Sequence, residues 1–207
     1  MEATKIEYKK HTIQISYDEF SMHPRTDFDN LGSMVMFHNR YNLINEGFYN
    51  KNDFNSWEEL EKYIIRVEDI AVILPVYMYD HTGVVLNTTG FSCQWDSGQV
   101  GFIFISKAKA RTEYSWKQIT KTRRERLEKY LIEEVEVYSQ YLNGDVYGYT
   151  VLNEEGEEIE ADGGSYYGYD HEKSGLMENA KDAIDYEIER AKEEEKKNNP
   201  QIEMELA

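Results

Sequence analysis

Residues 91–106 read FSCQWDSGQVGFIFIS, a polar corner that runs into an unbroken apolar segment. The segment QVGFIFIS (99–106) has the length of a strand, and its continuous apolar character indicates a buried one. Turn-forming residues precede it, and Gly98 lets the chain enter the strand. We therefore expect a structural corner followed by a buried strand, in which Cys93 and Trp95 pack inward while Asp96 and Ser97 tie the turn.

Periodicity predicts the elements on either side of this strand. The repeat of Leu127, Leu131, Val135, Tyr138 and Leu142 indicates one face of a long helix that stops at Asn143-Gly144. Ser56 followed by Glu59 matches a capping box at the start of a shorter helix. The predicted elements are β structure over 4–17, a loop over 21–33, a strand over 34–41, helices over about 56–67, 116–142 and 174–197, and hairpins over 69–90 and 145–170.

This order of elements predicts an α+β fold. We expect a single domain with a mostly antiparallel sheet, one long helix and two shorter helices. The chain of 207 residues is long enough for one full hydrophobic core and short for two. We place the core domain at 1–172 and an acidic C-terminal helix and tail at 173–207. Pro75, inside the first strand of the 69–90 hairpin, predicts a bulge or an edge position there.

Composition excludes several classes of protein. A single cysteine excludes an intramolecular disulfide and favours a reducing compartment. No window approaches the roughly 20 apolar residues of a membrane-spanning helix, so we expect a cytoplasmic protein with no membrane partner. Phosphate-binding glycine loops, Gly-x-Ser-x-Gly elbows and His-Glu-x-x-His helices do not occur in the sequence. We expect no cofactor.

Charge is distributed unevenly along the chain. The 40 acidic and 23 basic residues give a net charge of −17, and residues 153–207 hold 18 of the acidic residues and 6 of the basic ones. Residues 107–129 carry the opposite charge, with nine basic residues and three acidic ones. Each block is consistent with an ordinary solvated face. The total charge argues against direct nucleic-acid binding, although Tyr114 and Trp116 accompany the basic block.

Two groups of residues are candidates for chemistry. Cys93 could act as a nucleophile with His81 as its base and Asp80 or Asp96 as the orienting group, although a lone cysteine is more often a small buried side chain. A pocket could also collect charged and imidazole side chains from distant segments, namely Asp27, His38, Arg40, His81 and Asp96. The loop DFDNLG (27–32) lacks the calcium ligands of an EF-hand, so we expect no metal site and expect Asp29 and Asn30 to close the turn.

Three stretches together resemble a family of small acidic proteins found mainly in bacteriophages and mobile elements. They are PRTDFDNLGSMVMFHNRY (24–41), YMYDHTGVVLNTTGFSCQWDSGQVGFIFISKAKARTEY (77–114) and YLNGDVYGY (141–149). The resemblance covers roughly residues 24–170, and the helix from Ser174 lies beyond the usual end of the family. The resemblance implies a phage accessory protein in a host bacterial cell, and it brings no catalytic residues.

In that setting, the acidic composition suggests an anti-defence inhibitor, of the anti-CRISPR or antirestriction type. A negative surface can occupy a site built for phosphates on a host nuclease or defence complex. The residues expected to bind this partner are Glu154, Glu155, Glu157, Glu158, Asp162, Tyr166, Tyr167, Tyr169, Asp182, Asp185 and Glu189. The alternatives are a small enzyme acting on a nucleotide or defence signal, and a phage protein without an inhibitory role.

Overall fold

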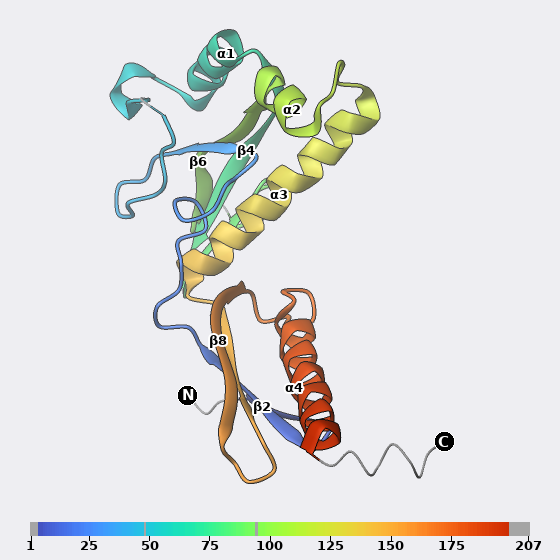
Figure 1. The fold of residues 1–207 in the computed structure, drawn as a ribbon. Helices are drawn as coiled ribbons and strands as arrows, with labels where there is room; N and C mark the ends of the chain where they lie inside the picture. Colours follow the sequence, from blue (N-terminus) through green and yellow to red (C-terminus); the bar gives the residue numbers. More distant parts are fainter. Residues whose placement is uncertain (1–3, 48, 94, 199–207) are drawn as a thin grey trace. The chain divides into compact units, whose positions relative to one another are not determined.

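The computed structural model describes residues 4–47, 49–93 and 95–198, and the chain divides into two compact units (Figure 1). Unit 1 consists of residues 1–22 and 145–207, and unit 2 consists of residues 23–144. Each unit combines a four-stranded antiparallel sheet with helical structure, which is three helices in the described part of unit 2 and one in that of unit 1, and this confirms the predicted α+β class. Within the described residues, no helix is both long and apolar enough to cross a membrane.

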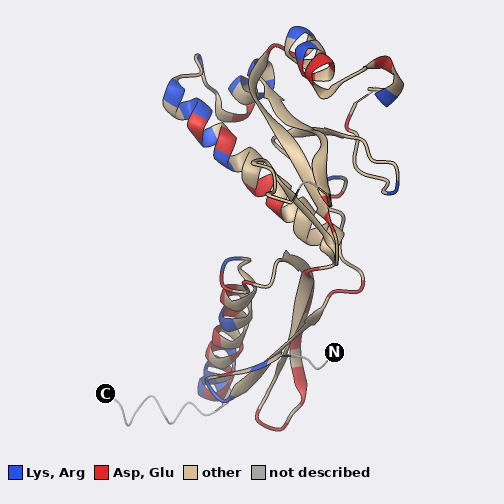
Figure 2. Cartoon of the chain, turned by 180° about the vertical axis from the view of Figure 1, so that it is seen from behind, with Lys and Arg blue, Asp and Glu red and all other residues tan. Residues whose placement is uncertain are grey.

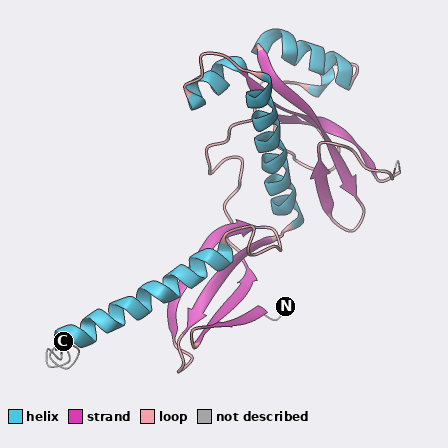
Figure 3. Cartoon of the chain, turned by 90° about the vertical axis from the view of Figure 1, so that its right-hand side faces the viewer, coloured by secondary structure: helices cyan, strands magenta, loops and turns pink. Residues whose placement is uncertain are grey.

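The sheet of unit 2 has the order β3-β6-β4-β5. Figure 3 shows strands in magenta and helices in cyan. The strands of unit 2 are β3 (Ser33–Met36), β4 (Ile70–Asp80), β5 (Val84–Asn87) and β6 (Ser97–Ser106), and its helices are α1 (Trp57–Glu68), α2 (Lys107–Tyr114) and α3 (Lys121–Asn143), with a short 3-10 turn at Lys51–Asp53. The apolar run of the opening stretch is therefore a central strand, β6. Strand β5 pairs only with Tyr77–Asp80, so Pro75 of β4 lies where β6 is the only strand partner among the described pairings.

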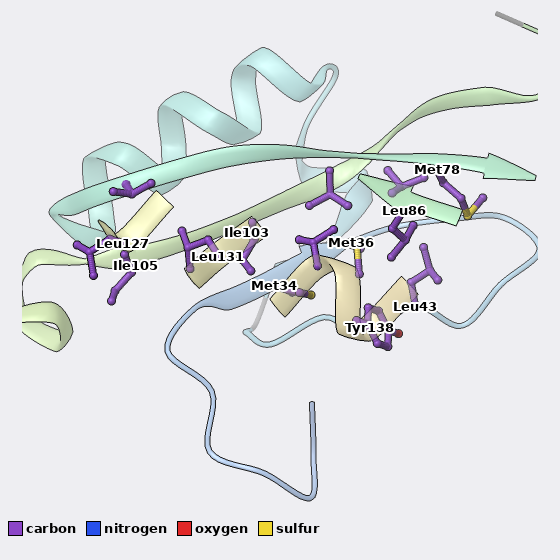
Figure 4. Packing of buried hydrophobic residues seen from close by; sticks show 14 of the residues in the cluster. Met34, Met36, Leu43, Met78, Leu86, Ile103, Ile105, Leu127, Leu131 and Tyr138 are labelled. Carbon is purple, nitrogen blue, oxygen red and sulfur yellow. The ribbon is translucent and has the colours of Figure 1, made fainter. Parts of the chain in front are cut away.

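Helices cover both faces of this sheet, which explains why β6 is apolar at successive positions. Ile103 and Ile105 pack in one cluster with Leu127 and Leu131 of α3 (Figure 4). Phe102 and Phe104 point the other way, into a second cluster with Leu60 and Ile64 of α1. A strand that is buried on both faces has no exposed side on which polar residues could alternate.

Strands β6 and β3 approach closely at Gly101. A Cβ atom added at this glycine would clash with the carbonyl oxygen of Val35 and would lie 2.8 Å from the Cα of Met36. The close approach therefore requires glycine inside a strand, where glycine usually weakens structure. β3 ends at Met36, earlier than the predicted strand over 34–41, because Phe37 to Arg40 turn away to form a loop.

The helix ends of unit 2 agree with the capping signals in part. The Ser56 side chain accepts a hydrogen bond from the Glu59 amide, as the capping box predicts. α3 ends at Asn143 as predicted, and Gly144 follows with a φ of 78°. The predicted start at residue 116 is wrong, because Ser115 takes a left-handed conformation and Thr120 caps α3 instead. The residues before Ser115 form a separate helix, α2, which the apolar periodicity did not predict.

Unit 1 is built from the segments that precede and follow unit 2. Its sheet has the order β1-β2-β7-β8, with strands β1 (Thr4–Tyr8), β2 (His11–Tyr17), β7 (Val146–Leu152) and β8 (Glu158–Tyr167). Helix α4 (Leu176–Asn198) packs on one face of this sheet, where Leu176, Ala180 and Ile184 form the predicted stripe against Ile13 and Val151. The boundary expected between residues 172 and 173 thus lies inside unit 1, since α4 completes the core of that unit.

Candidate functional site

Several predicted site residues line one cavity in unit 2. The cavity has a volume of about 290 Å³, and its polar lining includes His38, Arg40, Asp80 and Asp96. His38 and Arg40 lie in the loop after β3, Asp80 is the last residue of β4, and Asp96 directly precedes β6. The Asp80 amide donates to the Asp96 carbonyl oxygen at 2.8 Å, which joins the two strand ends. The cavity thus lies where three separate segments of the sheet meet.

Asp80 is the anionic centre of this cavity. Its carboxylate forms an ion pair with the Arg40 guanidinium and accepts a hydrogen bond from the Tyr41 hydroxyl at 2.8 Å. That hydrogen bond, together with burial, raises the pKa of Tyr41. The Asp80 side chain is largely covered, whereas the Arg40 side chain is exposed. The Arg40 guanidinium therefore faces solvent, and the covered Asp80 carboxylate fixes its position.

His38 is held in its neutral form beside this pair. Burial lowers the pKa of His38, and the positive charge of Arg40 lowers it further. The Arg40 amide donates to Nδ1 of His38 at 3.2 Å, so the ring proton belongs on Nε2. The imidazole also stacks on Tyr41 with ring centroids 5.1 Å apart. A neutral imidazole with a fixed tautomer can donate one hydrogen bond to a group in the cavity.

The proposed catalytic set around Cys93 comes together in an unexpected order. Cys93 Sγ lies 3.8 Å from Asp96 Oδ2, and the same oxygen lies 3.3 Å from His81 Nδ1. The carboxylate therefore stands between the thiol and the imidazole, and no hydrogen bond joins Cys93 to His81 in the described part of the chain. A nucleophilic cysteine needs its base in direct contact, so this geometry fits a structural corner better than a catalytic dyad.

The corner itself is tied as predicted, but its tryptophan is not buried. The Ser97 hydroxyl donates to the Cys93 carbonyl oxygen across the turn. The expectation that Trp95 packs inward is wrong, since 95% of its surface is exposed. β6 begins at Ser97, and the Asp96 and Cys93 side chains contact each other inside the bend, which leaves Trp95 on the outer side of the turn and at the rim of the cavity.

Asp27 does not join this cavity. Its carboxylate accepts hydrogen bonds from the His23 amide at 2.8 Å and the Thr26 hydroxyl at 2.9 Å, and the His23 bond is the main reason that its pKa is lowered. Asn30 closes the same loop by donating to the carbonyl oxygens of Pro24 and Phe28. In the described ranges, no group of three or more His, Cys, Asp or Glu side chains is placed to hold a metal ion.

The acidic residues expected to bind a partner lie in unit 1. This unit contains 23 acidic and 9 basic residues, a net charge of −14, whereas unit 2 has 17 and 14, a net charge of −3. Figure 2 marks the positions of Asp and Glu along the β7–β8 hairpin and on α4, where basic residues are interspersed. Glu155, Glu157, Glu158, Asp182 and Glu189 are exposed. Glu154 pairs with Lys10 at 3.0 Å and Asp185 pairs with Lys9 at 2.6 Å.

The tyrosines expected in this interface have different environments. Tyr166 is 8% exposed and belongs to the core beneath α4, so its ring cannot serve as a contact. The Tyr166 hydroxyl donates a hydrogen bond to the Asp162 carboxylate at 2.7 Å, so this carboxylate already has a partner within the protein. The Tyr167 hydroxyl donates to the Met22 carbonyl oxygen, and Tyr169 is 80% exposed. Two exposed aromatic residues of unit 1, Phe20 and Tyr186, were not predicted; their sequence neighbours carry no pattern that distinguishes them.

Comparisons of the chain with protein-family models, with curated proteins and with solved structures found no match.

Proposed function

We propose that this protein is a phage-encoded anti-defence inhibitor that binds a host nuclease or defence complex stoichiometrically. The observation that carries the proposal is the concentration of charge: unit 1 holds −14 of the net −17, with exposed carboxylates on the β7–β8 hairpin and on α4. Nucleases and CRISPR effectors present positive surfaces to nucleic acid, and a negative protein surface is complementary to them. The inhibitor acts in the cytoplasm of the host bacterial cell.

The acidic surface of unit 1 is defined here as Glu155, Glu157, Glu158, Asp182 and Glu189. Tyr169 and Tyr186 are exposed in the same unit and supply aromatic contact area, which protein interfaces use for much of their binding energy. Charge then accelerates association and selects the partner, while the aromatic residues slow dissociation. This division of roles predicts binding that weakens with salt but is not abolished by it.

The test is inhibition of DNA cleavage by a panel of purified restriction nucleases and CRISPR effector complexes. Inhibition should saturate at a fixed ratio of protein to effector, since the inhibitor is not consumed. Binding measured by calorimetry should weaken between about 0.1 M and 1 M salt, because the screening length falls from about 10 Å to about 3 Å. Absence of binding to every effector, in a phage whose growth still depends on the gene, would contradict the proposal.

Charge-neutral variants locate the interface. The triple variant Glu155→Gln, Glu158→Gln and Asp182→Asn should weaken binding about tenfold, because three exposed charge pairs at about 0.5 kcal/mol each amount to about 1.5 kcal/mol. The matched control neutralises three exposed or half-exposed acidic residues of unit 2: Asp53→Asn, Glu61→Gln and Glu133→Gln. Equal loss in both variants would show that total charge matters and that the acidic surface does not.

A small enzyme acting on a nucleotide or a defence signal is the second candidate. The cavity favours it, because Arg40 and neutral His38 could contact a phosphate or a base there. Arg40→Gln and His38→Ala would abolish turnover of such an enzyme and leave stoichiometric inhibition unchanged, and Cys93→Ser with His81→Ala would test the alternative catalytic set. If neither inhibition nor turnover is found, the result would favour the third alternative, a phage protein without an inhibitory role.

A further inference from the structure

Unit 2 carries a surface whose charge is opposite to that of the whole molecule. Nine of its 14 basic residues lie between 107 and 129, where only three acidic residues accompany them. Figure 2 shows these residues on α2 and on the first turns of α3. The net charge of −17 argues against nucleic-acid binding only if it is spread evenly, and most of it belongs to unit 1.

Two arginines on this surface are held in place by a ladder of aromatic rings. Trp116 stacks on Tyr114 with centroids 4.4 Å apart, and Tyr130 continues the stack 6.2 Å from Tyr114. The Arg123 guanidinium lies 4.8 Å from the Trp116 ring centre, and the Arg126 guanidinium lies 5.1 Å from Tyr114 and 5.4 Å from Tyr130. We call these five residues the arginine ladder.

Contact with the aromatic rings restrains the positions of both guanidinium groups and leaves most of their donors available. Arg123 donates to the Gln118 carbonyl oxygen at 2.6 Å, and Arg126 donates to the Tyr130 hydroxyl at 3.0 Å. Each guanidinium has five N–H donors in total. No carboxylate forms an ion pair with either arginine within the described ranges. Two cations held in position at little further entropic cost form a prepared site for an anion.

The other seven basic residues of the segment fall into two groups. Lys107, Lys109 and Arg124 contact Asp69 or backbone carbonyl oxygens, and Lys121 pairs with Glu125 at 3.9 Å, so these four have partners within the protein. Arg111, Lys117 and Lys129 are exposed on the same elements. The first turns of α2 and α3 contain no acidic residue, although carboxylates there would stabilise both helices. A bound anion would offset this unfavourable arrangement.

The chemistry of the surface favours phosphate over a protein partner. Protein interfaces centre on desolvated apolar and aromatic side chains. Between residues 107 and 130, none of the described large apolar side chains is exposed, and the rings of the arginine ladder are only half-exposed and face one another or a guanidinium. Interfaces with nucleic acid are more polar and more positively charged. Arginine also matches the geometry of phosphate oxygens through paired hydrogen bonds.

We propose that the arginine ladder and the exposed basic residues beside it bind the phosphodiester backbone of nucleic acid, without base specificity. This inference goes beyond the proposed function and does not rest on it, because the acidic surface belongs to unit 1 and the arginine ladder to unit 2. A protein with both surfaces could contact a nuclease and the nucleic acid that the nuclease carries.

The test is fluorescence anisotropy with labelled DNA of about 20 nucleotides, long enough for one binding site, as a single strand and as a duplex. The logarithm of the binding constant should fall linearly with the logarithm of salt concentration between about 50 and 200 mM. The slope should be about −0.9 per phosphate contact for the duplex and about −0.7 for the single strand, and the form that binds more tightly identifies the ligand.

Variants assign the binding to the arginine ladder. Arg123→Gln with Arg126→Gln should remove about two contacts from the salt slope and weaken binding by tenfold or more at about 50 mM salt. Lys117→Gln with Arg111→Gln leaves the stacked rings untouched and should also reduce the slope, in case the first variant unfolds. The matched control, Lys196→Gln with Lys197→Gln, removes the same charge from unit 1 and should leave binding unchanged.

Three results would overturn the inference: no salt-dependent binding of either DNA, equal weakening by the unit 1 control, or displacement of DNA by polyglutamate as readily as by unlabelled DNA. The last result would assign the surface to an acidic protein. The variant Glu155→Gln, Glu158→Gln and Asp182→Asn should keep its DNA affinity, so failure of the inhibitor proposal and failure of this one are separate results.

Discussion

At the scale of single residues, burial controls the acid–base properties of the tyrosines in unit 1. Tyr149 lies in the core under α4 with 6% of its surface exposed, and its pKa is raised to about 12, chiefly by burial. The neighbouring Tyr166, Asp162 and Glu160 contribute to this rise because they disfavour a second negative charge. Burial and a hydrogen bond with Tyr17 also raise the pKa of Tyr147.

This shift predicts a loss of stability in alkaline solution. The unfolded chain releases the Tyr149 proton near pH 10 and the folded chain near pH 12, so the unfolded state binds fewer protons between these values and stability falls as pH rises. Two pKa units correspond to at most about 3 kcal/mol. Urea unfolding at pH 9 to 12 should show this slope, and Tyr149→Phe should reduce it while leaving stability near pH 7 little changed. An unchanged slope in the variant would assign the alkaline loss to other groups.

At the scale of elements, a buried arginine ties α3 to the loop that precedes β3. The Arg25 side chain is 1% exposed and donates to Glu46 and Glu134 at 2.7 Å, to Asn30 at 2.8 Å and to the Gly32 carbonyl oxygen at 2.7 Å. Glu134 of α3 also accepts the amides of Leu31 and Gly32. Burial alone would lower the pKa of Arg25, but the two carboxylates raise it, so the guanidinium stays charged.

Removing one carboxylate should therefore be costly. Glu134→Ala is expected to lower the free energy of unfolding by about 3–5 kcal/mol, because it leaves a buried cation short of its partner and two amides without an acceptor. The control Glu133→Ala changes an exposed neighbour on the same helix and should cost less than about 0.5 kcal/mol. Urea denaturation measures both. A small effect at Glu134 would mean that Glu46 alone suffices to hold Arg25.

Helix boundaries illustrate what local sequence predicts. The start of α1 follows from Ser56 and Glu59, because capping involves only backbone and side chains within one turn. The predicted start of α3 at residue 116 is wrong because Ser115 takes a left-handed conformation that ends α2, and Trp116 stacks back on Tyr114 instead of beginning the next helix. The apolar repeat that predicts α3 begins only at Leu127, so it does not fix where the helix starts.

At the scale of the whole molecule, unit 2 is a continuous segment inserted between two strands that pair with each other. β2 ends at Tyr17 and β7 begins at Val146, and Tyr17 lies opposite Tyr147 in their register. Unit 2 has its own sheet, its own cores on both faces of that sheet and three helices. A unit with its own core is expected to fold alone.

Expression of residues 23–144 as a separate chain tests this expectation. The fragment should show a helical and sheet circular dichroism spectrum and a cooperative thermal transition, because its core clusters contain no residue of unit 1. The companion experiment expresses unit 1 without the insertion, with a short linker that joins Met22 to Asp145, and measures the same two properties. A fragment that stays unfolded would show that the two units depend on each other for stability.

The candidate site was predictable only where its residues are close in sequence. Cys93, Asp96 and Ser97 form the expected corner, because a turn of five residues constrains their positions. Arg40 and Asp80 meet only through the packing of the β3 loop against the end of β4, which no local pattern indicates. The same limit applies to Asp27, which bonds to its neighbours in the loop and does not reach the cavity.

The sequence by itself determined the α+β class, the burial of the strand β6, the stripes of α3 and α4 and the opposite charges of residues 107–129 and 153–207. These features follow from periodicity and composition, which can be read within a short window of the sequence. Only the tertiary structure decided that the strands form two sheets, that β2 pairs with β7 across an inserted unit, that Trp95 faces outward and that Arg123 and Arg126 stack on one ladder. Such choices depend on which surfaces can be buried together after distant segments meet, and that information is spread over the whole chain.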